Sequence, residues 1–203
     1  MKVVRYDQLL DGIRPHLSGC GDGLIVRTMR SIGQEFCRRS QCWREKISKN
    51  MVAGTRSYTL TSAFSADIQR VRDVWFLSAT DVTNGEDGTL QDINSIKFTP
   101  PSTLLLPYNP GQSITGGLVV RVILTPQYNA DEIGDEVANL WGFALEAGVI
   151  GRIKAMPNQP WSDERGARDW STRFDDGITQ AETDSDKNFT NMDLTSTGPG
   201  WLI

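Results

Sequence analysis

Apolar residues recur every three or four positions in the first part of the chain. After a short helical stretch over residues 6–14, this spacing is followed by Ile25, Met29, Ile32 and Phe36. Such a stripe is typical of one buried face of a helix, and we expect this helix to end near Ser40. Asp22 follows a glycine-rich turn and is the expected N-cap, because a carboxylate there accepts hydrogen bonds from the first backbone amides.

The pattern changes between residues 51 and 126, where short segments are separated by Gly, Pro, Asn and Asp. This punctuation is typical of a meander of antiparallel strands. The clearest strand spans residues 118–124, in which one face carries Leu118, Val120, Val122 and Leu124. Alternation of this kind predicts a strand with one buried face. Further strands are expected over residues 51–60, 68–77, 95–99 and 104–107.

Helical spacing returns after residue 126. A helix is expected over residues 135–156, preceded by an acidic stretch at 131–135 that suits a helix N-terminus. Its expected apolar face consists of Val137, Leu140, Trp141, Ala144 and Leu145, and small residues nearby would let another helix approach closely. A proline-containing break at 157–161 leads to a last helix, for which Ser162 is the expected cap. The apolar stripe of that helix contains Ala167, Trp170, Phe174, Ile178 and Ala181.

Together these patterns predict an α+β protein. A helical bundle is expected from both chain ends, residues 1–50 and 127–183, with an antiparallel β domain of sandwich or barrel type inserted at 51–126. Residues 184–203 are expected to form an extended C-terminal tail. This tail is largely polar but contains Trp201, Leu202 and Ile203. Apolar residues on a polar tail are typical of docking anchors, although packing onto the protein's own core is the alternative.

Composition and charge exclude several classes of protein. The chain has 203 residues, of which 38% are hydrophobic and 23% charged, as in globular proteins. The net charge is −4, distributed as +5 over residues 1–50, −1 over 51–126 and −8 over 127–203. This acidic balance argues against a protein that coats DNA non-specifically. We expect neither a membrane span nor a signal peptide, because no apolar segment is long enough.

Candidate catalytic and metal-ligating residues are few. The chain has one histidine, His16, and three cysteines, Cys20, Cys37 and Cys42. These four could ligate zinc, but their spacing matches no standard zinc finger, and free thiols in a reducing cytoplasm are the favoured interpretation. Carboxylate pairs such as Asp163 and Glu164 fall at expected helix starts. We therefore expect no enzyme and no cofactor, and a thiol or metal enzyme is the least favoured alternative.

Several short motifs are similar to those of one known family. They are Pro15-His16-Leu17, Cys20-x-Asp22-x-Leu24-Ile25, Glu35-Phe36-Cys37-x-x-Ser40-x-x-Trp43, Gly54-x-x-x-Tyr58-x-Leu60, Pro157-Asn158-Gln159-Pro160-Trp161 and Phe174-x-x-Gly177-Ile178. With them the chain resembles, in outline over residues 5–180, the head-to-tail adaptor proteins of tailed phages. These proteins are also called connectors, or tail tubular protein A in short-tailed phages.

The resemblance implies a structural virion protein at the neck of the particle, made in the host cytoplasm. Adaptors of this family form rings of twelve copies beneath the portal ring, extend the DNA channel and meet the tail or nozzle protein. Their C-terminal segments grip the portal, which would make Trp201, Leu202 and Ile203 portal-binding residues. An acidic channel would let the genome slide without sticking. A tail-terminator or neck protein that contacts the tail tube is the alternative.

Overall fold

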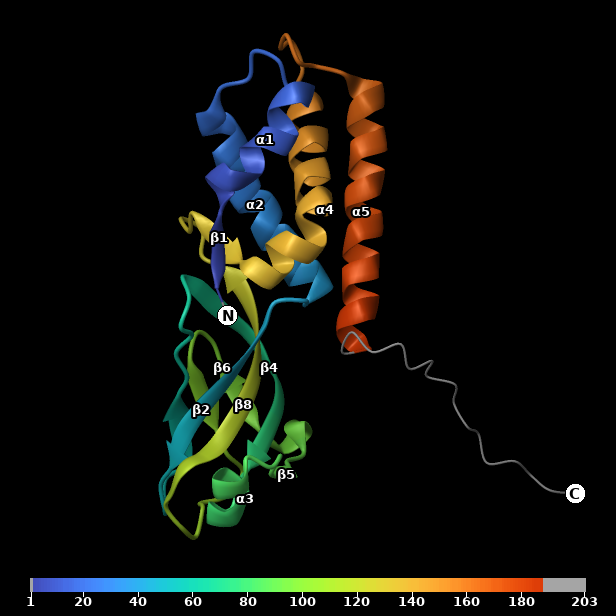
Figure 1. Ribbon diagram of the computed structural model, residues 1–203. Coiled ribbons are helices and arrows are strands. Elements are labelled where there is room, and N and C mark those ends of the chain that lie inside the picture. Colours follow the sequence, from blue (N-terminus) through green and yellow to red (C-terminus); the bar gives the residue numbers. More distant parts are fainter. Residues whose placement is uncertain (1, 188–203) are drawn as a thin grey trace, which may run out of the picture.

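The long helices and the two larger antiparallel sheets occupy opposite ends of the molecule (Figure 1). In the computed structural model, which describes residues 2–187, the α+β class is confirmed. The helical end contains the short α1 (Leu10–Ile13), flanked by 3-10 turns η1 (Tyr6–Leu9) and η2 (Arg14–His16), and the long α2 (Asp22–Ser40), α4 (Asp135–Lys154) and α5 (Glu164–Asp186). Among residues 2–187, none of the helices has the length and hydropathy needed to cross a membrane.

The strands form three antiparallel sheets. The largest has the order β2-β8-β4-β5 and comprises β2 (Arg44–Met51), β8 (Ile114–Pro126), β4 (Ala66–Phe76) and β5 (Thr89–Leu90). The second has the order β3-β7-β6 and comprises β3 (Ser57–Thr59), β7 (Thr103–Leu105) and β6 (Lys97–Thr99). At the helical end, β1 (Val3–Arg5) pairs with β9 (Glu132–Gly134). The short α3 (Ala79–Asn84) and the 3-10 turn η3 (Ile93–Ser95) lie between strands.

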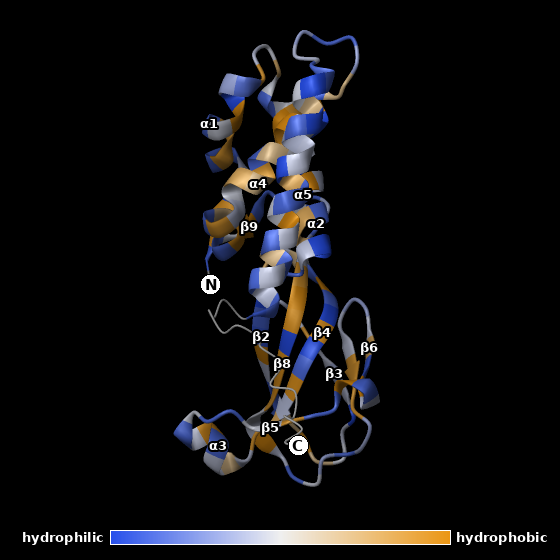
Figure 2. Ribbon diagram, turned by 90° about the vertical axis from the view of Figure 1, so that its right-hand side faces the viewer, coloured by the Kyte–Doolittle hydropathy of each residue, from blue (hydrophilic) through white to orange (hydrophobic). Residues whose placement is uncertain are grey.

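One hydrophobic core runs through both ends of the molecule. The predicted stripe of α2 is buried along its whole length, and so is the predicted face of β8 with Leu118, Val120, Val122 and Leu124. Figure 2 shows hydrophobic residues along the part of β8 nearest the helices. Trp43 lies where the two ends meet, is 1% exposed, and packs on Phe64 with ring centroids 5.8 Å apart. The sheet therefore continues the core of the helices.

Close packing of α4 on α5 follows from the small residues of α4, as expected from the sequence. A Cβ atom at Gly148 would lie 2.7 Å from the Phe174 ring and 2.9 Å from Ile32. A Cβ atom at Gly177 of α5 would lie 2.4 Å from that of Ala144. Because such distances are too short for real atoms, these glycines set how closely the helices approach.

Several predicted boundaries are wrong. The chain enters β2 at Arg44, within the range expected to be helical, and the strand expected over 51–60 is the end of β2, a loop and β3. The expected helix start at residue 135 is confirmed by α4, but the acidic stretch before it contains the unexpected strand β9. Helix α5 continues to Asp186, past the expected start of the tail at 184. In each case pairing or packing with distant residues determines the local structure.

Two predicted helix caps are also wrong. Asp22 is the first residue of α2, Gly21 is the N-cap, and the Asp22 carboxylate instead accepts hydrogen bonds from Arg14 Nε and Nη2, at 3.2 and 2.8 Å. The cap of α5 is Asp163, whose Oδ1 accepts from the Gly166 amide at 2.9 Å. Ser162 Oγ serves the preceding turn by accepting from the Gln159 amide.

One residue of the predicted apolar face of α4 does not belong to the core. Leu140 is 54% exposed, and Phe143 on the same helix is 62% exposed. The remaining predicted residues of that face, Val137, Trp141, Ala144 and Leu145, are buried. Helix α4 therefore presents large apolar side chains both to the core and to its outer surface.

Candidate functional site

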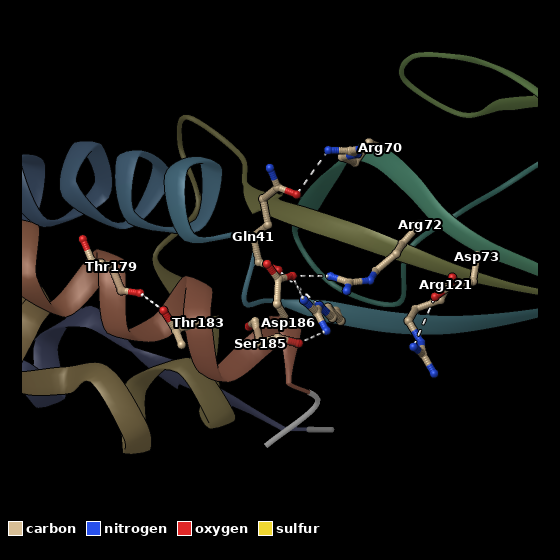
Figure 3. Close-up of polar contacts among 10 residues, drawn as sticks. Gln41, Arg70, Arg72, Asp73, Arg121, Thr179, Thr183, Ser185 and Asp186 are labelled. Carbon is tan, nitrogen blue, oxygen red and sulfur yellow. Dashed lines mark hydrogen bonds and ion pairs between the residues drawn. The ribbon is translucent and has the colours of Figure 1, made fainter. Parts of the chain in front are cut away.

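A cluster of arginines lies where the end of α5 meets the large sheet (Figure 3). Its members, which we call the junction arginines, are Arg44, Arg70, Arg72 and Arg121. They come from β2, β4 and β8, which are neighbours in the sheet, and antiparallel register places Arg44 opposite Ile123 and Asp73 opposite Arg121. The cluster is therefore a product of strand pairing rather than of sequence proximity.

Two of the junction arginines, Arg44 and Arg72, hold the last turn of α5. Arg72 Nη1 donates to Asp186 Oδ1 at 3.1 Å, and Arg44 Nη2 lies 3.5 Å from the same oxygen. Arg44 Nη1 also donates to the backbone carbonyl of Ser185. A cation at a helix C-terminus is favourable, because it compensates the partial negative charge of the last carbonyls. The chain is thus fixed against the sheet just before residue 188.

Burial shapes the electrostatics of the cluster. The side chain of Arg44 is only 13% exposed. Burial lowers the pKa of Arg44, and the nearby charges of Arg72 and Arg121 lower it further, whereas the Asp186 carboxylate acts in the opposite direction. An arginine remains protonated under such conditions, so Arg44 keeps its positive charge although its side chain is largely shielded from water. A carboxylate partner is worth most there, because the attraction is less screened by water.

The other two junction arginines are oriented by Asp73 of β4 and by Gln41, which follows α2. Arg121 Nη1 donates to Asp73 Oδ2 at 3.2 Å, and its guanidinium lies 5.0 Å from the centre of the Trp75 ring. Arg70 Nη1 donates to Gln41 Oε1 at 3.3 Å. Two guanidinium groups thus contact the Asp186 carboxylate, while Arg121 and Arg70 are held nearby by Asp73 and Gln41. Arginines outnumber carboxylates in this cluster, which makes it a basic region beside the end of α5.

The binding residues expected from the sequence, Trp201, Leu202 and Ile203, lie outside the described residues. What the structure supplies is the point from which the chain departs toward them. That point is the end of α5, held by Arg44 and Arg72.

The four residues considered for zinc are not brought together. Among residues 2–187, His, Cys, Asp and Glu side chains form no group of three or more placed to hold a metal ion. His16 packs edge-on against Trp170, with ring centroids 4.9 Å apart. Cys37 and Cys42 are buried and hydrogen-bonded to each other, whereas Cys20 is half-buried.

The carboxylates considered in pairs have structural partners instead of a shared site. Arg30 pairs with Asp131, Arg39 with Asp175, and Lys154 lies 3.0 Å from Asp163. Hydrogen bonding from the Gly166 amide, followed by that from Lys154, lowers the pKa of Asp163. These contacts fix helix ends and join α2 to its neighbours.

Sequence reasoning missed the junction arginines. The available indication was Arg121, a single charge within the apolar run 118–124. A charge on a strand surrounded by Val and Leu needs a partner, which the structure supplies as Asp73 and Trp75. The identity of that partner depends on strand register, which the sequence pattern did not determine.

Comparison with protein-family models and with curated proteins finds no match for this chain. An account of its function therefore depends on its own residues and their geometry.

Proposed function

We propose that the protein is a head-to-tail adaptor, a structural virion protein that forms a ring of twelve copies between the portal and the tail or nozzle and extends the DNA channel. In this proposal the helical bundle comes from both chain ends, the β domain is an inserted module, and the C-terminal segment is an extended tail. Trp201, Leu202 and Ile203 bind the portal. The protein has no catalytic role and needs no cofactor.

The observation that carries the proposal is the attachment of the end of α5 to the junction arginines. Because Arg44 and Arg72 hold Ser185 and Asp186, every copy in a ring would release its following residues from an equivalent, fixed position. Residues 188–203 could reach about 53 Å when extended, at roughly 3.3 Å per residue. That length is sufficient to leave the subunit and lie along a neighbouring ring.

The chemistry of the tail agrees with a docking role. Burial of a Trp, Leu or Ile side chain contributes roughly 1.5–3 kcal/mol each before the cost of ordering the segment. Repetition around a ring converts even a small surplus per tail into strong attachment. The net charge of −8 over residues 127–203 is compatible with a channel that repels DNA phosphates.

Two further features support the proposal. Several apolar residues on which the family resemblance rests, among them Phe36, Trp43, Leu60 and Phe174, are buried in the core, as expected if they preserve a fold. The far end of the sheet exposes Leu90, Tyr108 and Val52, and exposed apolar groups of this size are typical of surfaces that meet a partner. A tail or nozzle protein would bind there.

The proposal is tested by deleting the tail while keeping the contacts of Ser185 and Asp186 with Arg44 and Arg72. Because Ser185 and Asp186 belong to α5, the deletion should start at residue 188. We expect the shortened protein to keep its circular dichroism spectrum and to bind purified portal at least tenfold more weakly in a sedimentation assay. Replacement of Trp201, Leu202 and Ile203 by Ser should have the same effect.

Replacement of Thr195, Ser196 and Thr197 by Ala, in the same tail, is the matched control and should leave portal binding unchanged. If the deletion variant binds portal as strongly as the full-length protein, the proposal that the tail anchors the protein to the portal is wrong. Binding to purified tail tube in place of portal would favour the tail-terminator alternative.

A further inference from the structure

Large apolar side chains are exposed at two places on the helical end, on different sides of the molecule. Leu140 and Phe143 of α4 are 54% and 62% exposed, and Tyr128, between β8 and β9, is 77% exposed. In Figure 1 the loop from β8 to β9 lies at the left of the molecule and α5 at the right. Grouped apolar exposure of this kind marks contact surfaces in soluble proteins.

The first place is a hollow between α4 and α5, which we call the α4–α5 groove. Its volume is about 370 Å³, and its lining includes Leu140, Phe143, Arg173, Asp176 and Gln180. The guanidinium of Arg173 lies 4.6 Å from the centre of the Trp170 ring, so a cation–π contact already engages it. Asp176 is exposed and forms no ion pair with any residue in the range 2–187.

The second place is a hollow beside Tyr128, which we call the Tyr128 surface. Its volume is about 470 Å³, and it is lined by Gly23, Arg27, Arg30, Ser31 and Tyr128. Arg30 is held by an ion pair with Asp131. Arg27 is exposed, and within the described part of the chain it forms no ion pair. Each surface thus combines an exposed apolar group with a charged side chain that has no ion-pair partner among residues 2–187. These are Arg27 at the Tyr128 surface and Asp176 in the groove, where Arg173 lies against the Trp170 ring.

We propose that the two surfaces bind each other between copies of this chain: Tyr128 of one copy enters the α4–α5 groove of the next, where Arg27 faces Asp176. A contact between two different surfaces is heterologous, and its repetition around an axis forms a ring when the rotation closes. The proposal rests on the proposed ring and names its contact. Charge complementarity of this kind also fixes the direction in which copies join.

The test places a photoreactive benzoylphenylalanine at position 143 and uses an equal mixture of ¹⁴N- and ¹⁵N-labelled protein without portal. After irradiation, we expect isotopically mixed cross-links from position 143 to the loop at residues 127–131. A protease that cleaves after acidic residues is needed, because no Lys or Arg lies between Arg121 and Arg152 and trypsin would leave both sites in one fragment.

Other outcomes of the cross-linking overturn the proposal. Cross-links to residues 188–203 would show that the tail covers the groove. Cross-links within one isotope only, to a different surface of the second copy, or none at the highest protein concentration would show that copies do not meet in this way.

Charge exchange tests the pairing itself. Arg27→Glu and Asp176→Arg should each lower the yield of mixed cross-links several-fold, because like charges then face each other. The variant that carries both changes should recover most of the yield, since the pair is restored in reverse. Arg38→Glu, further along α2, is the matched control and should have no effect.

A double variant that stays as weak as the single variants would contradict the pairing. Since no portal is present, loss of this contact and loss of portal binding are measured separately.

Discussion

The cysteines illustrate how one residue type takes different roles in this fold. Cys37 lies near the end of α2 and Cys42 just after it, and both are buried, whereas Cys20 is half-buried in the turn before α2. Burial raises the pKa of the Cys37 thiol, and its hydrogen bond with Cys42 raises it further. Burial also raises the pKa of Cys20. Cys20 is therefore the accessible thiol, although it is less acidic than an ordinary cysteine.

We expect one thiol to react in the folded protein and three in the denatured protein, measured with a chromogenic disulfide reagent and no reductant. Only the thiolate is the nucleophile, so the reaction of Cys20 should accelerate as the pH rises through its raised pKa. Cys20→Ser should remove the reaction of the folded protein, and Cys42→Ser should retain it. Two rapidly reacting thiols in the folded protein would contradict the burial of the pair.

At the scale of elements, the contact between α4 and α5 depends on glycines whose space is already occupied. Gly148→Ala would place a methyl group 2.7 Å from the buried Phe174 ring. We expect this change to lower the free energy of unfolding by about 1–3 kcal/mol, as overpacking does in other cores. Chemical denaturation of the purified variant measures the change.

The same helix provides a matched control. A Cβ atom at Gly142 would meet only Leu9, at 4.0 Å, which is an ordinary contact. Gly142→Ala should therefore leave the stability unchanged or raise it by up to about 1 kcal/mol, because alanine favours helix. Equal stability of the two variants would show that α4 and α5 are not held by close approach.

The sequence predicted elements best where apolar residues follow a single period. Periodicity identified both α2 and β8, although the last residues of β8 are buried on both faces, Ile123 included. In α4 the apolar residues lie on nearly every side, so periodicity could not separate Leu140, which is exposed, from Trp141, which is buried. Strand β9 has only three residues, and its pairing with β1 depends on contacts across the chain.

The candidate site was less predictable than the elements. A docking role for Trp201, Leu202 and Ile203 was predicted from apolar side chains on a polar tail, and their binding to the portal from the family resemblance; both stay predictions. The attachment of the chain before them depends on Arg44 and Arg72, which lie on different strands and meet Asp186 only in the folded protein. The spacing of these residues in the sequence does not indicate that they contact one another.

At the scale of the whole molecule, the helical and sheet ends behave as one body because their core is continuous. Copies can therefore associate through the helices while the sheet keeps a fixed direction. We expect the full-length protein, mixed with purified portal, to form a large closed assembly whose mass corresponds to a ring of adaptor copies on the portal. Native mass spectrometry or light scattering measures this, and a protein that stays monomeric both alone and with portal would contradict it.

The pairing of β2 with β8 has a consequence for how this architecture can vary. The chain leaves the helical end along β2 and returns along β8, and the two strands remain hydrogen-bonded neighbours from Arg44 opposite Ile123 to Met51 opposite Ile114. Segments whose two ends lie side by side are the ones that tolerate replacement. Between these strands, β4 has to stay, because it pairs with β8 and carries Arg72, which holds Asp186. The loops of the three-stranded sheet β3-β7-β6 can therefore lengthen or shorten without disturbing the contact between the large sheet and α5. Evolution or protein engineering could thus give the protein a new outer partner while its helical end keeps its contacts.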